Sequence, residues 1–211
     1  MRYGILMLAL LLPLTAAAQP TDLAAPWSFE RMMQQRTQVQ IARADFVEVR
    51  KFSSGQTQKS SGMLIYRAPG VLERQTATPI IERVVIENDR MTMEMEMNSG
   101  HSMRREFPLS RVPAMRPFFV ALRSLLSGDT ETMQRTFEIN VEGDGSAWKI
   151  RLVPREKNDE QTRDIVFSGQ SNELKTVELR HKNGDSSHTS LTPVAVELKP
   201  SSTKPALSRE S

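Results

Sequence analysis

Residues 81–97 read IERVVIENDRMTMEMEM and consist of two alternating runs joined by Asn88-Asp89. Successive side chains of a strand point to opposite faces, so each run predicts a strand with one apolar face. Asn and Asp tolerate the backbone of a tight turn, and the pair between the runs therefore predicts a β-hairpin. The second strand would carry four methionines on one face: Met91, Met93, Met95 and Met97.

The methionine face of this strand is unusual, because Val and Ile are better strand formers and pack more rigidly. The methionine side chain is unbranched and flexible, and it fills irregular or changing spaces. Two interpretations are open: the four residues are ordinary core, or they form the wall of a cavity. Four alternate residues span about 20 Å of strand, which is enough to contact an acyl chain along its length.

Further strands are predicted on both sides of the hairpin. Before it, residues 41–52 alternate, residues 53–62 (SSGQTQKSSG) indicate a break, and short extended runs flank Pro69-Gly70. Toward the C-terminus, Gly-Asp-Gly at 143–145 and Asn-Gly at 183–184 indicate two more hairpin turns. These runs predict consecutive antiparallel strands.

Two helices are predicted. Residues 27–40 are amphipathic, and Pro26 suits the start of a helix. A second helix would begin near Pro117 and end before Gly128. Its apolar stripe consists of Phe118, Leu122 and Leu125, widened by Phe119 and Leu126.

The predicted order is one helix, five strands, a second helix and about five more strands, joined by short connections. An antiparallel sheet of this length curls or closes to hide its edges and its apolar face. If it closes tightly, side chains fill the interior; if it stays half open, a ligand cavity remains. The periodicity of the sequence does not distinguish these two outcomes.

The two ends of the chain are expected to lie outside the folded domain. Residues 1–18 place one Arg before a short apolar run and end on small residues, which is typical of a cleaved secretory signal peptide. Residues 197–211 are rich in Pro, Ser and charge and predict a disordered tail. One domain, residues 19–196, is expected between them. We therefore expect a soluble, exported protein.

Composition excludes several classes of protein. The chain has no cysteine, so it can form no disulfide framework and carry no lipid on an N-terminal Cys. Its 28 Lys and Arg face 25 Asp and Glu, giving a net charge of +3. A nucleic-acid-binding protein would show a concentrated basic stripe, so we expect no nucleic-acid partner.

The stretch from residue 44 to residue 97 resembles the periplasmic outer-membrane lipoprotein carriers, the LolA-like family. The features that carry the resemblance are Phe46 in the first strand, Gly62, the strand end from Tyr66 to Pro69, and the Asn88-Asp89 turn. RPFFVALRSLLSGD at 116–129 resembles the central helix of that family, and WKIRLVP at 148–154 resembles the strand after it. The shared order of these motifs extends over most of residues 27–196.

The resemblance implies a fold, a site and partners. It implies a mainly β fold with α: a half-open, strongly curved antiparallel sheet (an unclosed barrel), with helices as a lid over an apolar cavity that receives acyl chains. It also implies a monomer in the periplasm, with an inner-membrane donor transporter and an outer-membrane acceptor. The ligand would be the acyl chains of a lipid or lipoprotein, and no cofactor or metal is expected.

Two positions depart from the pattern of the carriers. Ala68 stands where they have an arginine before the strand-end proline, and Arg67, one residue earlier, should face the other side. Leu72 stands in place of an aromatic residue. The closer resemblance is therefore to the divergent branch of the family, which is associated with the export of other lipids or acyl products.

Two sets of residues are candidates for binding. The expected acyl-chain contacts are Phe46, Leu64, Tyr66, Leu72, Met91, Met93, Met95, Met97, Phe118, Phe119, Leu122 and Leu125. The expected contacts to anionic head groups or to a partner transporter are Arg67, Arg104, Arg105, Arg116 and Arg123. For both sets the alternative stays open, which is plain core for the first and a solvated basic face for the second.

Two other classes of function are alternatives. A lipid-sensing regulatory module would bind the same kind of ligand and transmit its presence to a partner. A hydrolytic enzyme is less favoured, because no G-x-S-x-G elbow accompanies His101, His181 and His188. His181 and His188 flank the Asn-Gly turn and could share one sheet face as metal ligands, although no third ligand is evident. We therefore expect a protein that is not an enzyme.

Overall fold

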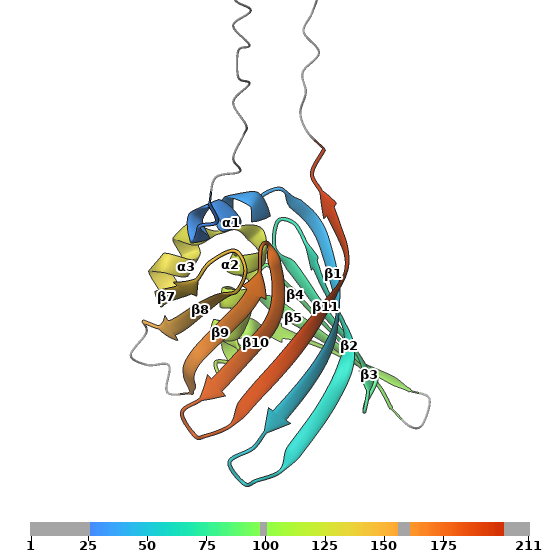
Figure 1. Cartoon of the computed structure of the whole chain (residues 1–211). Coiled ribbons are helices and arrows are strands. Elements are labelled where there is room, and N and C mark those ends of the chain that lie inside the picture. The colour runs from blue at the N-terminus through green and yellow to red at the C-terminus, as the bar shows by residue number, and fades with distance from the viewer. Residues whose placement is uncertain (1–25, 98–100, 156–160, 201–211) are drawn as a thin grey trace, which may run out of the picture.

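The described part of the chain, residues 26–97, 101–155 and 161–200, folds into one sheet of eleven antiparallel strands and three α-helices (Figure 1). The structure is a computed structural model. The expected signal peptide at residues 1–18 lies outside the described residues. The helices are α1 (Phe29–Arg36), α2 (Arg116–Ser127) and α3 (Thr130–Thr136), and a 3₁₀ turn, η1 (Leu109–Arg111), precedes α2.

The described strands form two sets, one before η1 and one after α3. The first set is β1 (Val39–Lys51), β2 (Thr57–Arg67), β3 (Val71–Thr78), β4 (Glu82–Glu87), β5 (Arg90–Glu96) and β6 (Ser102–Pro108). The second set is β7 (Phe137–Gly143), β8 (Trp148–Pro154), β9 (Thr162–Gln170), β10 (Glu173–His181) and β11 (Ser186–Leu198).

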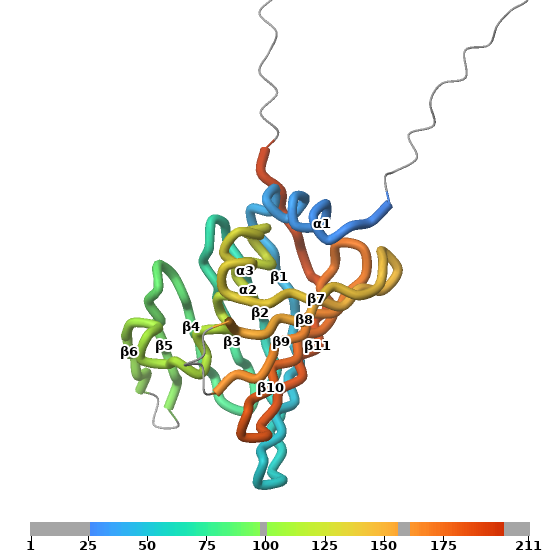
Figure 2. The backbone as a smooth tube through the Cα atoms, turned by 90° about the vertical axis from the view of Figure 1, so that its left-hand side faces the viewer, coloured from blue at the N-terminus to red at the C-terminus, as the bar shows by residue number. Residues whose placement is uncertain are grey.

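Each set of strands is a meander, and the two meanders meet where β1 pairs with β11. The strand order is β6-β5-β4-β3-β2-β1-β11-β10-β9-β8-β7, so β6 and β7 are the two edges. These edges do not pair with each other, and Figure 2 shows β5 and β6 set apart from β8 and β9. The predicted fold, a mainly β protein with a curved antiparallel sheet that is not closed into a barrel, is confirmed. Along the chain, η1, α2 and α3 connect the two edge strands β6 and β7.

The hairpin at the Asn88-Asp89 turn is confirmed. β4 and β5 pair antiparallel, with Ile86 opposite Met91 and Val84 opposite Met93. Asn88 has a φ of 48° and Asp89 a φ of 61°. A two-residue turn with positive φ at both positions matches the right-handed twist of the strands, and Asn and Asp tolerate it better than most residues.

Replacing Asp89 by glycine is expected to stabilise this hairpin. Glycine adopts a positive φ without the steric cost that a Cβ brings, so D89G should raise the free energy of unfolding by about 0.5 kcal/mol. Urea denaturation measures the change. The matched control T92G places the same residue inside β5, where glycine should lower the free energy of unfolding by about 0.5–1 kcal/mol. A destabilised D89G would contradict the role given to the turn.

The helices begin and end where the sequence supplies caps. Ser28 Oγ accepts a hydrogen bond from the backbone N–H of Arg31 at 3.2 Å, which satisfies a free donor at the start of α1. Gly128, with a φ of 75°, ends α2, as predicted. Asp129 then caps α3 by accepting from Thr132 N–H at 2.9 Å.

The second meander carries the solid part of the core. α2 contacts β9, and Leu125 and Met133 belong with Ile165 and Phe167 to one cluster of buried residues. α1 is held at one end of this core, where Trp27 stacks on Trp148 with ring centroids 6.4 Å apart. The helices are therefore fixed mainly by the last five strands.

Arg36 anchors α1 without a carboxylate partner among the described residues. It is 7% exposed, and its Nη2 donates to the carbonyl oxygen of Asn172 at 2.9 Å. Burial lowers the pKa of Arg36 to about 10, since removing a charge from water disfavours the charged form. The side chain therefore joins α1 to the turn between β9 and β10.

The structure corrects several predicted boundaries. The first helix covers only Phe29–Arg36 instead of residues 27–40, because β1 already begins at Val39. β6 and α3 were not predicted, since neither segment shows a clear apolar period. β2 begins at Thr57, inside the predicted break, because the sheet pairs its polar residues with β1. β11 continues to Leu198, so the tail does not begin at 197; residues 201–211 lie outside the described residues.

Candidate ligand-binding cavity

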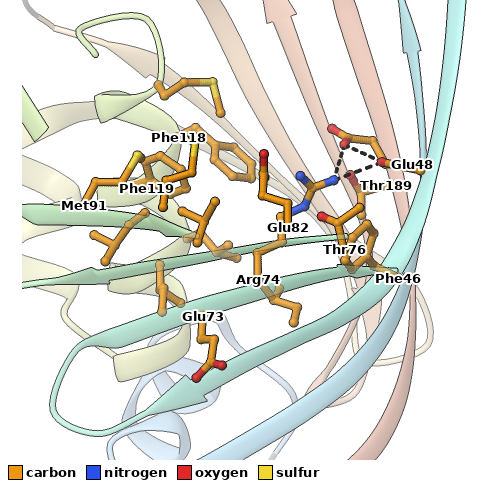
Figure 3. A pocket seen from close by; sticks show the side chains of 18 of the residues that line it. Phe46, Glu48, Glu73, Arg74, Thr76, Glu82, Met91, Phe118, Phe119 and Thr189 are labelled. Carbon is orange, nitrogen blue, oxygen red and sulfur yellow. Dashed lines mark hydrogen bonds and ion pairs between the residues drawn. The ribbon is translucent and has the colours of Figure 1, made fainter. Parts of the chain in front are cut away.

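A cavity of about 390 Å³ lies between the inner face of the first meander and α2 (Figure 3). Its volume falls near the lower end of the range found for small-molecule sites. Strands β1 to β6 and the segment from residue 112 to residue 122 supply most of its wall, and β10 and β11 add three residues. Over the second meander, the helices and the sheet pack together into a solid core. Over the first meander, part of the space between α2 and the sheet is open.

Strand pairing orders the inner face of the first meander into rows that cross the strands. The row nearest α2 begins at Tyr66 and continues with four apolar residues: Leu72, Ile86, Met91 and Phe107. It lies close to α2 because Gly70, two residues before Leu72, lies against Arg123 of that helix. The next row is Leu64, Arg74, Val84 and Met93. The third row is Gly62, Thr76, Glu82 and Met95. Polarity therefore increases with distance from α2.

The apolar end of the cavity is formed by aromatic and flexible side chains. Phe118 and Phe119 of α2 pack edge to face, with ring centroids 5.5 Å apart. Met91 and Met93 line the same cavity, and Figure 3 draws Met91 at the same end as Phe118 and Phe119. Such a wall of unbranched thioethers and phenyl rings can adapt to apolar chains of different shape.

The polar end of the cavity is built around an ion pair between neighbouring strands. Arg74 Nη2 lies 2.7 Å from Glu48 Oε2 and donates to Ser60 Oγ at 3.0 Å. The guanidinium of Arg74 lies 4.5 Å from the centre of the Phe46 ring. Arg50 lies 3.9 Å from the other oxygen of Glu48. The wall therefore carries a network of charged and hydroxyl groups at this end (Figure 3).

The structure brings eight of the twelve predicted acyl-chain contacts to the cavity. They are Phe46, Leu64, Leu72, Met91, Met93, Phe118, Phe119 and Leu122. The other four lie outside its wall. Tyr66 is 2% exposed and Leu125 is fully buried, and both belong to the packed core.

Only the first two methionines of the predicted face line the cavity. Met95 lies on the same face of β5, opposite Glu82, but outside the cavity wall. Met97 lies beyond the end of β5 and is 50% exposed. The prediction of one continuous methionine wall over all four residues is therefore wrong, because the strand passes the end of the cavity before the alternating sequence stops.

The five predicted arginines do not form one surface. Arg67 pairs with Glu73 at 2.6 Å and Arg104 with Glu94 at 3.2 Å, both on the outer face of the sheet. Arg105 is exposed and shares the row of Met93 at the sheet edge. Arg123 lies beside the turn at Gly70, and Arg116 begins α2.

The outer face of the first meander carries a chain of ion pairs across five strands. Glu73 is 2% exposed and contacts Arg67 at 2.6 Å and Arg83 at 2.7 Å. Arg83 also reaches Glu94, which contacts Arg104. Burial alone would raise the pKa of Glu73, but hydrogen bonds from Arg83, Gln75 and Arg67 outweigh it and lower the pKa to about 2.

Sequence reasoning missed the polar end of the cavity. Glu48 and Arg50 alternate with Phe46 along β1, and this spacing alone places them on the inner face. Gln58 and Ser60 lie within residues 53–62, which were predicted to be a break between strands instead of part of one. No local signal indicates that Thr76 and Glu82 share this wall, because their contact depends on the register between β3 and β4.

His181 and His188, the pair that the sequence left open as metal ligands on one sheet face, lie on opposite faces of the sheet. His188 pairs across the strands with Glu178, and its Nδ1 lies 3.5 Å from a carboxylate oxygen of that residue. His181 is three residues further along β10 than Glu178, so its side chain points to the other face of the sheet. Within residues 26–97, 101–155 and 161–200, no group of three potential ligands could hold a metal ion. The helices of this part of the chain are too short or too polar to span a membrane.

A curved, unclosed sheet with a mostly apolar cavity beneath a helix is an arrangement that can enclose a small apolar molecule. The chain belongs to the family described as outer membrane lipoprotein carrier protein LolA-like, whose sequence profile matches residues 17–209. This assignment confirms the resemblance found in the sequence.

Two solved structures are similar in fold. A DUF1329 family protein from Desulfovibrio piger is 9% identical, with 82% of this chain and 91% of that chain covered and a TM-score of 0.43. A LolA superfamily protein from Nitrosomonas europaea is 7% identical, with 81% and 93% covered and a TM-score of 0.37. A comparison with curated proteins found no match.

Proposed function

We propose that the protein is a periplasmic carrier that binds an acyl chain of a lipid or lipoprotein and passes it toward the outer membrane. The observation that carries the proposal is the cavity of about 390 Å³, whose wall beside α2 is formed by apolar side chains only. Membership of the LolA-like family supports the same role. The protein acts by binding and release and performs no chemical reaction.

The energetics of such a carrier require control of release. Burial of one CH₂ group stabilises by about 0.8 kcal/mol, so a chain of roughly fifteen carbons gains about 12 kcal/mol relative to water. A membrane or an acceptor protein offers a similar gain, and the two largely cancel. Small differences in affinity between donor, carrier and acceptor then set the direction of transfer.

α2 is the element that can control access to the cavity. Phe118, Phe119 and Leu122 place one face of the helix in the cavity wall, whereas Leu125 packs into the core. In this proposal α2 acts as a lid: a small shift of its first two turns opens the apolar end while the last turn stays fixed. The exposed arginines Arg104 and Arg105 are available for contact with an inner-membrane donor or with anionic head groups.

Native mass spectrometry of protein purified gently from periplasmic extract tests the proposal. We expect a fraction of the protein to carry one lipid or acyl species, because the volume of the cavity suits a single chain. Incubation with vesicles should then move the bound species into the membrane. A consistently empty protein would contradict binding, and a bound species that never leaves for vesicles would favour a lipid sensor over a carrier.

A further inference from the structure

The polar end of the cavity holds groups that no residue of the described chain satisfies. Thr76 is 8% exposed, and its Oγ1 is buried in the cavity wall without a hydrogen-bond partner among the described residues. A buried hydroxyl without a partner costs free energy, so a ligand that supplies the missing bond would gain stability at this point. Figure 3 shows Thr76 at the same end of the cavity as Glu48.

Glu82 lies directly across from Thr76 in the pairing of β3 with β4 and also lines the cavity. Its carboxylate makes no ion pair or hydrogen bond with any described residue. Arg74, one row away, already pairs with Glu48 and Ser60. This end of the cavity therefore holds three polar groups. They are the unpaired carboxylate of Glu82, the unpaired hydroxyl of Thr76 and the guanidinium of Arg74, whose charge Glu48 neutralises.

The charge at this end is balanced. On the inner face, Glu48 and Glu82 carry two negative charges, and Arg50 and Arg74 carry two positive charges. Glu73 also borders the cavity, but its carboxylate pairs with Arg67 and Arg83 on the outer face. An anionic head group would compete with Glu48 for Arg74 and approach the unpaired Glu82, so like charge disfavours it. An ammonium head group would pair with Glu82 and donate to Thr76 Oγ1, but it has no acceptor for the hydroxyl proton of Thr76 or for Arg74, and Arg50 and Arg74 repel it.

A hydroxyl group can do both, because it donates one hydrogen bond and accepts others. We infer that the ligand of this cavity is an amphiphile with an uncharged, hydroxyl-bearing head group, such as an acylglycerol or a glycolipid. Its hydroxyls donate to Glu82 and exchange hydrogen bonds with Thr76, while its chain lies along Met93 and Met91 toward α2. This inference rests on the proposed binding of acyl chains and adds the class of head group and the direction in which the ligand lies.

Three amphiphiles with chains of equal length test the inference: 1-monolauroylglycerol, laurate and dodecylamine. Titration calorimetry at neutral pH should give an affinity about ten-fold higher for monolauroylglycerol than for either charged probe. Laurate or dodecylamine binding as tightly as monolauroylglycerol would overturn the inference and leave the proposed function intact. Failure of all three probes to bind would contradict both.

The variant T76V tests whether Thr76 causes the preference for monolauroylglycerol. Valine has nearly the shape of threonine but no hydroxyl, so T76V should bind laurate unchanged and monolauroylglycerol about five-fold more weakly. The free protein should unfold at the same or a higher temperature, because an unsatisfied buried hydroxyl has been removed. This result separates a lost ligand contact from a damaged fold.

T78V is the matched control. Thr78 lies two residues further along β3, is exposed, and exchanges a hydrogen bond with Ser61 at 2.8 Å outside the cavity. T78V should keep the full preference for monolauroylglycerol. An unchanged preference in T76V, or an equal loss in both variants, would overturn the assignment of the head-group end.

Discussion

Replacing Met93 by glutamate is expected to weaken the binding of an acyl-chain probe at least about 100-fold. Met93 lies in the middle row of the cavity wall, between the apolar end and the polar end. A carboxylate at this position has to lose water when a hydrocarbon chain lies against it, which costs several kcal/mol. A loss of about 2.7 kcal/mol corresponds to a 100-fold change in affinity.

The same change at Met95 gives the matched control. Met95 lies on the same strand and the same face, two residues further on, but outside the cavity wall. M95E should therefore bind monolauroylglycerol within about three-fold of the unchanged protein. Calorimetric titration gives the affinities, and far-ultraviolet circular dichroism of the free variants verifies that both are folded. Equal losses in M93E and M95E would show that the chain does not follow the cavity.

Replacing Glu73 by glutamine is expected to lower the free energy of unfolding at pH 7 by about 2 kcal/mol. The pKa of Glu73 falls from 4.5 to about 2 in the folded protein. A shift of this size corresponds to about 3 kcal/mol, which the solvent exposure of Arg67 and Arg83 reduces. E73Q also leaves two guanidinium groups without their shared partner.

The sign of the pH dependence follows from the lowered pKa. A carboxyl group that binds its proton less tightly in the folded state stabilises fully above its unfolded pKa, near 4.5, and loses this contribution as pH falls toward 2. The difference in stability between the unchanged protein and E73Q should therefore be constant from pH 7 to about pH 5 and shrink below that. Urea denaturation at a series of pH values measures it.

Glu94, the next carboxylate in the same chain of ion pairs, provides the comparison. Its side chain is 32% exposed, and its contacts with Arg83 and Arg104 are both 3.2 Å. Exposed pairs of this kind contribute less than about 1 kcal/mol, so E94Q should change stability little. A difference between the unchanged protein and E73Q that stays constant down to pH 2 would contradict the role assigned to Glu73.

The sequence was sufficient to predict those parts of the fold that depend on local chemistry. The hairpin at Asn88-Asp89 and the helix from Pro117 to Gly128 are marked by residues whose backbone preferences act within a few positions. β6 carries no such mark, and its form depends on the neighbouring strand. α3 has the Asp129 cap, but its seven residues are too few to show an apolar period. Pairing with a partner overrides a weak local preference, as the polar start of β2 shows.

The site was predicted in part for the same reason. Alternation along β5 is local, so the shared face of Met91 and Met93 could be predicted. The length of the cavity is not local: it depends on where α2 crosses the sheet, which is why Met95 and Met97 were assigned to it wrongly. The proximity of Thr76 and Glu82 depends on one register between two strands.

One meander lines most of the cavity and the other carries the solid core. Contact with a ligand and stability of the fold therefore depend on different parts of the sequence. Most side chains that would touch a ligand come from residues 46–122, whereas much of the tightly packed interior under α2 and α3 comes from residues 137–179. If the protein binds a ligand as proposed, substitutions that alter its selectivity fall largely in one continuous segment and spare the other. A lineage of such carriers could then diversify its choice of ligand while the capacity to fold is inherited unchanged.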